Sequence, residues 1–284
     1  MLTTNKEMLI AARKEGYAIP AINTQGGNYD IIWAICRAAE ELKSPIILAH
    51  YVSTGAFSGN DWFVEVARWC ANKVSVPVSI HLDHGESVEI CTEMLKLGFT
   101  SIMFDGSIKP IEENAALTNQ VISACRRQGV PVEAEIGELL RLDDGGNILE
   151  NKNIADVDLV RRFLNLCQPD TLAIGIGNAH GYYQGEPDIR LDVLKRVKEF
   201  TDIPLVLHGC TGMSEEVIRQ AIGLGVAKIN FGTEIRYKYV AYYREALDTL
   251  EHQGHSWKLS QYASNKLTED IKKIIMLSGS QGKA

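Results

Sequence analysis

The stretch Val76-Pro-Val-Ser-Ile-His-Leu-Asp-His-Gly85 decides the fold. Up to Leu82 it is short and rich in β-branched and apolar residues, which is typical of a β-strand. Asp83 and His84 follow at once, so the strand delivers ionisable side chains at its C-terminal end. The same order recurs along nearly the whole chain, with amphipathic stretches between the apolar runs. This alternation predicts repeated βα units around a parallel sheet.

Eight strands and nine helices are expected from this alternation. The strands are Tyr17 to Ile22, Pro45 to Ala49, Val76 to Leu82, Thr100 to Phe104, Val130 to Ala134, Thr171 to Ile176, Pro204 to Leu207, and Ala227 to Ile229. The helices are Tyr29 to Leu42, Asp61 to Lys73, Ser87 to Leu97, Glu112 to Gln128, Asp156 to Leu166, Leu191 to Phe200, Ser214 to Gly223, Thr233 to His252, and Ser260 to Leu277. Four helices begin with a residue that favours the N-cap position, namely Asp61, Ser87, Asp156 and Ser214.

Eight strands that are each followed by a helix favour an α/β fold of the TIM-barrel type, an eight-stranded parallel (β/α) barrel with additional C-terminal helices. An open doubly wound sheet is the alternative. The length of 284 residues allows one domain or two, but such barrels fill roughly 250 residues as one unit. We therefore expect a single barrel domain over residues 1–284.

Composition and charge limit the class of protein. A net charge of -7 argues against a nucleic-acid groove or an anionic membrane as partner, because both need a basic surface. Neither a signal sequence nor an apolar run of membrane-spanning length is present, so we expect a cytoplasmic protein. The six cysteines are scattered without CxxC pairs, which favours reduced and mostly buried thiols; they are Cys36, Cys70, Cys91, Cys125, Cys167 and Cys210.

Polar residues follow nearly every predicted strand. They are Asn23, His50, Asp83, His84, Asp105, Glu135, Asn178, His180, His208 and Asn230. In a parallel barrel the C-terminal ends of all strands meet on one face, where catalytic residues of this fold lie. The sequence therefore predicts one active site at that face.

Three histidines in this set, His84, His180 and His208, are each followed by glycine. A lone histidine at a strand end is more often a hydrogen-bonded structural residue than a ligand. Three imidazoles from different strands, however, match a catalytic zinc site with an open coordination position. His50 and His81 are left open between structural and catalytic roles.

Two further interpretations concern carboxylates. Asp83, beside a predicted metal ligand, suits a general acid and base, or it orients the ligand histidine. Asp105 and Glu135 could hold a second or alternative metal position, or form a hydrogen-bond network under the site.

Glycine-rich segments follow the last two predicted strands, His208-Gly-Cys-Thr-Gly-Met213 and Asn230-Phe-Gly-Thr-Glu-Ile235. Barrels frequently bind phosphate between these two loops, with backbone amides and a helix N-terminus. Thr233 is placed to cap the helix that follows. The polar stretch from Ile136 to Ile154 is long for a connection and is interpreted as an active-site loop.

Taken together, these residues resemble the class II fructose-bisphosphate and tagatose-bisphosphate aldolases, with a better fit to the shorter, tagatose-type branch. The resemblance runs nearly end to end through Tyr17-Ala-Ile-Pro-Ala-Ile-Asn23, His81-Leu-Asp-His84, Val132-Glu-Ala-Glu-Ile-Gly137, Gly177-Asn-Ala-His-Gly181, Leu205-Val-Leu-His-Gly209, Lys228-Ile-Asn230 and Gly279-Ser-Gln-Gly-Lys-Ala284. Cys210-Thr211 and Phe231-Gly232 depart from the residues usual in the family, as does the segment from His50 to Gly55, which we expect to face the aldehyde half of the substrate.

The resemblance implies Zn²⁺ on His84, His180 and His208, with Asp105 and Glu135 at the family's alternative metal position. It implies Asp83 as the proton donor and acceptor at the C4 oxygen. Dihydroxyacetone phosphate would be bound by a set of loop residues that we expect to comprise Asn23, Gly181, Gly209, Cys210, Thr211, Asn230, Phe231, Gly232 and Thr233. The second substrate would be an aldehyde or sugar phosphate, and the assembly a homo-oligomer, a dimer or tetramer.

Two other functions stay open at this point. One is a non-catalytic barrel subunit that supports a partner aldolase, and the other is a zinc hydrolase. The intact histidines disfavour the first, and the two glycine segments disfavour the second. The base that exchanges the proton of the keto-phosphate is assigned to Asp143 or Asp144 in the long loop.

Overall fold

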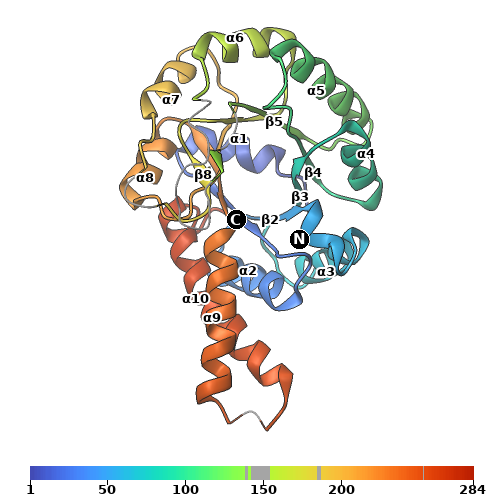
Figure 1. The fold of residues 1–284 in the computed structure, drawn as a ribbon, viewed down its shortest axis with the longest axis vertical. Coiled ribbons are helices and arrows are strands. Elements are labelled where there is room, and N and C mark those ends of the chain that lie inside the picture. The colour runs from blue at the N-terminus through green and yellow to red at the C-terminus, as the bar shows by residue number, and fades with distance from the viewer. Residues whose placement is uncertain (138–139, 142–153, 184–186, 252) are drawn as a thin grey trace.

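Eight strands close into a barrel in which every neighbouring pair is parallel (Figure 1). The computed structural model describes residues 1–137, 140–141, 154–183, 187–251 and 253–284. In order around the barrel the strands are β1 (Ile19–Asn23), β10 (Val226–Phe231), β9 (Leu205–Leu207), β7 (Thr171–Ile174), β5 (Val132–Ile136), β4 (Ser101–Phe104), β3 (Val78–Gly85) and β2 (Ile46–Tyr51). The TIM-barrel prediction is confirmed, and the doubly wound alternative is wrong.

Helices surround the barrel (Figure 1). They are α1 (Lys6–Glu15), α2 (Tyr29–Glu41), α3 (Asn60–Ala71), α4 (Val88–Leu97), α5 (Ile111–Arg126), α6 (Val157–Leu166), α7 (Leu191–Lys198), α8 (Glu215–Gly223), α9 (Thr233–Thr249) and α10 (Ser256–Ser278), with a short 3₁₀ helix η1 (Val52–Ala56). Nine of these ten α-helices of the described residues were predicted, although α9 ends before His252 and α10 begins before Ser260. The sequence missed α1, η1 and a small sheet in which β6 (Leu140–Arg141) pairs with β8 (Ala179–His180).

Three of the predicted helix caps are present. The side chains of Ser87, Asp156 and Ser214 each accept a hydrogen bond from a backbone amide in the first turn of α4, α6 and α8. Each bond satisfies one of the amides that a helix start leaves unpaired.

Two predicted caps are wrong. Asp61 lies inside α3, which is preceded by Gly59, and there its charge favours the positive end of the helix dipole. Thr233 is the first residue of α9, and Gly232 occupies the N-cap position without a side-chain bond. The start of α9 therefore has no side-chain cap.

The barrel wall separates two kinds of interior. Outward-facing strand residues such as Ile80 and Leu82 pack under the helices in the main apolar core. Inside the barrel, a smaller apolar cluster joins Leu9 of α1 to Ile19 and Ile47 of the first two strands. Helix α1 thus packs into the N-terminal end of the barrel, opposite the end at which the predicted polar residues emerge.

The C-terminal helices α9 and α10 form a hairpin that projects beyond the barrel (Figure 1). Five of its large apolar side chains are exposed among the described residues, namely Tyr237, Val240, Leu247, Trp257 and Met276. Within the described residues, no helix combines the length and hydropathy that a membrane crossing requires. The single-domain assignment over residues 1–284 stays a prediction.

Candidate metal centre and active-site cavity

A bulge at the end of β3 turns two consecutive side chains toward the same site. The register between β3 and β4 shifts between Leu82 and Gly85, and His84 has a positive φ of 53°. Successive strand residues normally face opposite sides, whereas a bulge re-aims a side chain. Asp83 and His84 therefore both reach the C-terminal face. Gly85 is needed here because a Cβ would lie 2.6 Å from the Met103 carbonyl oxygen.

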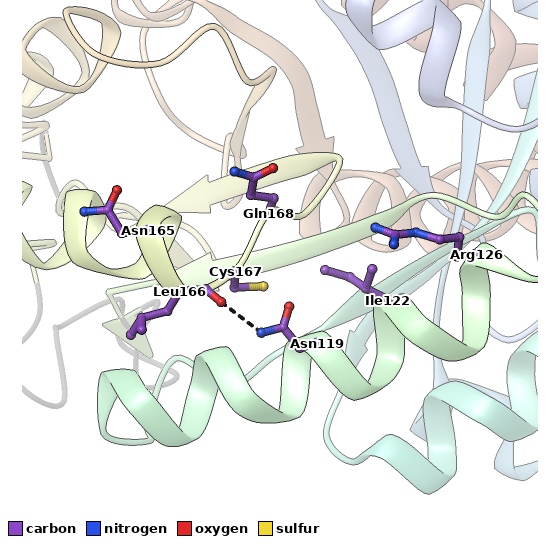
Figure 2. A pocket seen from close by; sticks show the side chains of 7 residues that line it. All are labelled: Asn119, Ile122, Arg126, Asn165, Leu166, Cys167 and Gln168. Atoms are coloured by element: carbon purple, nitrogen blue, oxygen red, sulfur yellow. Dashed lines mark hydrogen bonds between the residues drawn. The ribbon is translucent and has the colours of Figure 1, made fainter.

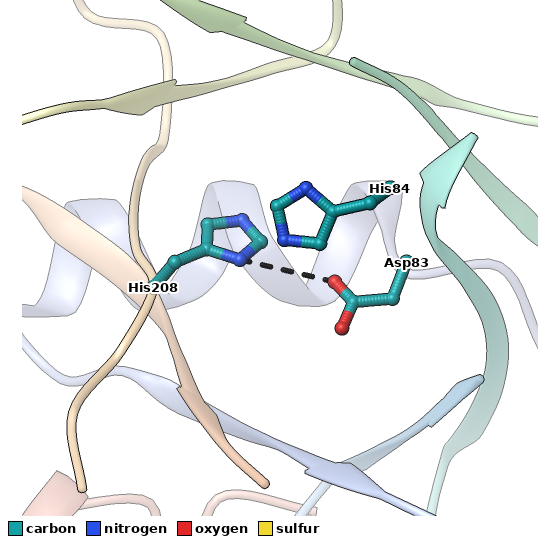
Figure 3. A group of neighbouring side chains, drawn as sticks. All are labelled: Asp83, His84 and His208. Atoms are coloured by element: carbon teal, nitrogen blue, oxygen red, sulfur yellow. Dashed lines mark ion pairs between the residues drawn. The ribbon is translucent and has the colours of Figure 1, made fainter. Parts of the chain in front are cut away.

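The three predicted ligand histidines converge. The centroid of the His84 ring lies 5.2 Å from that of His180 and 4.8 Å from that of His208, and the last two are 6.5 Å apart. Figure 3 shows Asp83 and His84, from β3, facing His208, which follows β9. One ligand atom from each of these three residues lies within 4.8 Å of the others.

The donor set fits a divalent metal ion. The Nε2 atom of His84 is buried and has no hydrogen-bond partner among the described residues. Its Nδ1 atom lies 2.8 Å from Asp105 Oδ2, the arrangement by which a carboxylate orients a metal-binding imidazole. A buried ring nitrogen without a hydrogen bond destabilises the folded protein unless a ligand binds to it. Zn²⁺ suits imidazole nitrogens with one position open.

Neighbouring charges shift the pKa values of His84 and Asp83 in the metal-free protein. Burial alone would lower the pKa of His84, but the Asp105 hydrogen bond and the charges of Asp83 and Glu135 raise it to about 10. Burial favours the neutral form of Asp83, yet the charges of His84 and His208 lower its pKa to about 2. Asp83 is therefore ionised at neutral pH and can accept a proton.

Glu135 lies behind His84 rather than in the cavity. Its Oε2 atom is 3.6 Å from His84 Nδ1 and has no hydrogen-bond partner among the described residues. Burial and the nearby charge of Asp105 raise the pKa of Glu135 well above its usual value. Together His84, Asp105 and Glu135 form a second group of potential ligands. The geometry accommodates both roles foreseen for the two carboxylates, an alternative metal position and a hydrogen-bond network.

His208 is held from several sides. Its Nε2 atom lies 3.0 Å from Glu133 Oε1, and its backbone carbonyl accepts a bond of 3.0 Å from the Asn178 side chain. On the cavity side, the Asn230 amide donates to Asp83 Oδ1 at 3.1 Å and lies 3.2 Å from His208 Nδ1. Asn178 thus holds the backbone of His208, whereas the Asn230 side chain contacts Asp83 and the His208 ring on the cavity side.

Two of the ligand-bearing segments also contact each other directly. The hydroxyl of Tyr183 accepts from the Ala179 amide at 2.8 Å and lies 3.0 Å from the Gly209 carbonyl oxygen. Gly209 has a φ of 65°, and a Cβ there would lie 2.3 Å from the Ala179 carbonyl oxygen. The glycine after His208 thus permits close approach to the segment that carries His180.

A cavity of about 900 Å³ opens at the C-terminal end of the barrel. Twelve predicted site residues line it: Asn23, Asp83, His84, Asp105, His180, Gly181, Gly209, Thr211, Asn230, Phe231, Gly232 and Thr233. Among them Gly232 and Thr233 form the start of α9, and Thr211 accepts from the Glu234 amide at 3.3 Å. A helix N-terminus therefore borders the cavity, an arrangement that favours anion binding.

Three predicted site residues do not line the cavity. Glu135 and His208 lie beneath it. Cys210 is buried in the apolar core, its thiol lies 3.3 Å from the Leu207 carbonyl, and its amide donates to the Asn230 carbonyl. Because both of its donors are directed elsewhere, the structure places Cys210 under the loop rather than against a ligand.

The two histidines whose roles were left open, His50 and His81, are both buried, and neither lines the cavity. His50 stacks on Phe63 with ring centroids 4.1 Å apart, and its Nε2 atom lies 2.7 Å from Asn60 Oδ1. His81 points into the barrel, where it contacts Ser101 and Lys228. Of the segment from His50 to Gly55, Tyr51 and Thr54 line the cavity.

Sequence reasoning missed several cavity residues. The cations Lys109 and Arg236 line it, together with Glu86, Tyr182 and Tyr237. Lys109, Tyr182, Arg236 and Tyr237 do not follow a barrel strand directly, so the pattern of polar strand ends did not single them out. Glu86 does follow β3, but β3 extends to Gly85, three residues beyond its predicted end at Leu82. Asp143 and Asp144, the candidates for a base, lie outside the described residues.

A smaller cavity of about 270 Å³ lies between α5 and the end of α6 (Figure 2). The Asn119 side chain donates to the Leu166 carbonyl at 2.9 Å across it. Arg126 and the buried Cys167 also line this hollow. No constellation of catalytic type converges there among the described residues.

Comparison with known proteins agrees with this geometry. Residues 3–283 match the family model described as Fructose-bisphosphate aldolase class-II. The D-tagatose-1,6-bisphosphate aldolase subunit GatY of Klebsiella oxytoca is 34% identical over 285 residues, covering 99% of each chain. The 6-phospho-5-dehydro-2-deoxy-D-gluconate aldolase of Bacillus subtilis (strain 168) is 39% identical over 236 residues, covering 81% of this chain and 79% of that protein.

A solved structure extends the likeness to three dimensions. The crystal structure of the YdjI aldolase from Escherichia coli K12 matches with a TM-score of 0.87 and 33% identity, covering 100% of each chain. The likeness therefore covers the whole barrel. The chain belongs to the class II fructose-bisphosphate aldolase family.

Proposed function

We propose that the protein reversibly cleaves a ketose 1,6-bisphosphate, or a related ketose 1-phosphate, to dihydroxyacetone phosphate and an aldehyde, with Zn²⁺ as cofactor. The observation that carries this proposal is the placement of two different groups in one cavity. Asp83, His84 and His180 line it, with His208 directly beneath, and the start of α9 borders the same cavity. A keto-phosphate needs both.

The residues of the chain have separate roles in the reaction. Asp83, ionised at neutral pH, accepts the proton of the C4 hydroxyl as the C3–C4 bond breaks. The electron pair of that bond stays on C3, and a proton delivered to C3 then gives dihydroxyacetone phosphate. Zn²⁺, when held by His84, His180 and His208, supplies a Lewis acid for the neighbouring keto oxygen.

The phosphate is assigned to the loops after β9 and β10. Thr211, Gly232 and Thr233 line the cavity beside the first turn of α9. Backbone amides at a helix N-terminus bind anions without a formal charge, which agrees with the acidic net charge of the chain. Tyr51 and Thr54, which line the cavity from the end of β2 and from η1, are left for the aldehyde half.

Proton exchange from dihydroxyacetone phosphate in heavy water, followed by NMR, tests the first half of this reaction without the unknown aldehyde. We would compare metal-loaded protein, chelator-treated protein and Asp83→Ala, with Asp61→Ala as a matched control at an exposed aspartate. Metal-dependent exchange that survives in Asp83→Ala, with aldol cleavage reduced by about 10²- to 10⁴-fold, is expected. If metal-loaded protein binds the phosphate but exchanges no proton, the proposal is wrong, and a supporting barrel subunit becomes the better interpretation.

Three further assignments accompany the proposal. The proton-exchanging base is Asp143 or Asp144, the assembly is a homo-oligomer, and the location is the cytoplasm. The exposed apolar side chains of the α9–α10 hairpin support the second assignment.

A further inference from the structure

A layer of charged and polar side chains fills the barrel interior directly beneath His208. Glu133, Lys228 and His81 belong to it, and each is at most 1% exposed. Barrels of this type usually fill their interior with bulky branched apolar residues. Burying an ion pair costs several kcal/mol per ion before the attraction between the charges is counted. Stability alone does not account for this layer.

Lys228 uses all of its hydrogen-bonding capacity inside the layer. Its Nζ atom donates to His81 Nε2 at 2.8 Å and to the two carboxylate oxygens of Glu133 at 2.9 and 2.7 Å. An ammonium group has three protons, and all three are directed to these acceptors. His81 must accept at Nε2, so its proton is on Nδ1, which lies 2.8 Å from Ser101 Oγ.

This arrangement excludes a covalent role for Lys228. A lysine that forms a Schiff base must present an unprotonated amine to the substrate. Lys228 is absent from the cavity lining in the part of the chain that the structure describes, and its three donors are engaged. Its partner, Glu133, is what links the layer to the metal centre.

Glu133 determines which nitrogen of His208 is protonated. Its Oε1 atom lies 3.0 Å from His208 Nε2. An ionised carboxylate can only accept, so Nε2 carries the proton and Nδ1 is the unprotonated nitrogen, which the Asn230 amide approaches at 3.2 Å. The tautomer is assigned here from the hydrogen-bond network. Nδ1 is the atom on the cavity side, 3.8 Å from Asp83 Oδ1.

We propose that Glu133, fixed by Lys228 and His81, is a positioning residue that holds His208 with Nδ1 directed at the metal. The inference rests on the metal site assigned under the proposed function. Glu133 touches neither the cavity nor the reacting atoms, so it acts only through His208. Carboxylates that orient metal-binding histidines typically contribute 10- to 100-fold to metal affinity.

Two double variants isolate this role from simple loss of charge. Lys228→Met with Glu133→Gln removes both charges but keeps an amide oxygen that can accept from His208. Lys228→Met with Glu133→Leu removes the charges and the acceptor together. Replacing a buried ion pair by neutral residues of similar size is often tolerated, so both variants are expected to fold. The pair differs only in the group that faces His208.

The measurement is Co²⁺ affinity by competition with a chelator, together with the visible spectrum of the bound ion, in the absence of substrate. We expect the Met/Leu variant to bind Co²⁺ about 10- to 100-fold more weakly than the Met/Gln variant, with an altered spectrum. Thermal unfolding of the metal-free forms should be similar for the two. A purely structural role of the layer would instead change unfolding and leave affinity equal.

Failure of the two proposals gives different results. Equal Co²⁺ affinity and equal spectra in wild type and in the Met/Leu variant would overturn the positioning role while leaving the metal site intact. Absence of Co²⁺ binding in wild-type protein would overturn the metal site and this inference with it. Thr171→Val, which removes a 3.3 Å contact to the other Glu133 oxygen, is the matched control and should retain wild-type affinity.

Discussion

Replacing Gly209 by alanine should damage both folding and the metal centre. Gly209 follows His208 and has a φ of 65°. A Cβ would lie 2.3 Å from the Ala179 carbonyl oxygen and 2.8 Å from its carbonyl carbon, both backbone atoms that cannot rotate away. Since Ala179 precedes His180, any relief of this clash separates two predicted metal ligands.

Gly129→Ala is the control variant, because it introduces the backbone strain of a positive φ without a steric clash. Its φ is 67°, and a Cβ there would meet nothing within 4 Å. Alanine in this left-handed region costs roughly 1 kcal/mol, which corresponds to about 3 °C in the unfolding temperature. For Gly209→Ala a steric cost of roughly 1 to 3 kcal/mol is added, so a loss of about 6 to 12 °C is expected.

Thermal unfolding of the metal-free proteins and aldol-cleavage kinetics of the metal-loaded proteins test this. Gly129→Ala should keep wild-type kcat/KM, whereas Gly209→Ala should lose about 100-fold, because small displacements of catalytic groups are costly. The reasoning is refuted if Gly209→Ala unfolds at the same temperature as Gly129→Ala and retains its activity.

Three other predictions concern separate parts of the molecule. Because the pKa of His84 is raised to about 10 without metal, its ring is protonated at pH 8, and zinc binding should release about one proton at that pH. The number of protons released should fall as the pH rises through 10. Calorimetry in buffers of different ionisation enthalpy measures it. Burial raises the pKa of the Cys210 thiol to about 12, so iodoacetamide should modify it only after unfolding; rapid labelling of native protein would contradict this. Arg13→Ala removes the hydrogen bonds that the guanidinium donates to the carbonyls of Thr201, Asp202 and Leu224 at the N-terminal end of the barrel. The free energy of unfolding should fall by about 2 kcal/mol, while kcat stays unchanged.

The barrel and the catalytic face were predictable because both depend on local order along the chain. Each strand is a short apolar run, and its C-terminal polar residue follows within a few positions, as for Asn23 and Asp105. Closure of the sheet then brings those ends together without further information. This is why twelve predicted residues line one cavity.

What the sequence could not predict depends on contacts between distant segments. Lys228 and Glu133 are 95 positions apart, and nothing near either residue identifies the other as its partner. Cys210 illustrates the reverse case. It lies within the predicted glycine-rich loop, yet its amide donates to the Asn230 carbonyl and its thiol is buried in the apolar core. Spacing predicted the loop, but not which of its atoms face the cavity.

The distribution of charge gives a reason for the proposed placement of the metal and the phosphate at different positions. The ionised carboxylates of Asp83 and Asp105 lie beside His84, whereas burial raises the pKa of Glu135, and the buried cation Lys228 is already paired with Glu133. A phosphate placed here would be repelled, whereas a divalent cation offsets the excess of negative charge. The anion is therefore better bound at the start of α9, where backbone amides rather than side-chain charges receive it. Under the proposed function, a keto-phosphate would reach from one of these places to the other with its C3–C4 bond at Asp83.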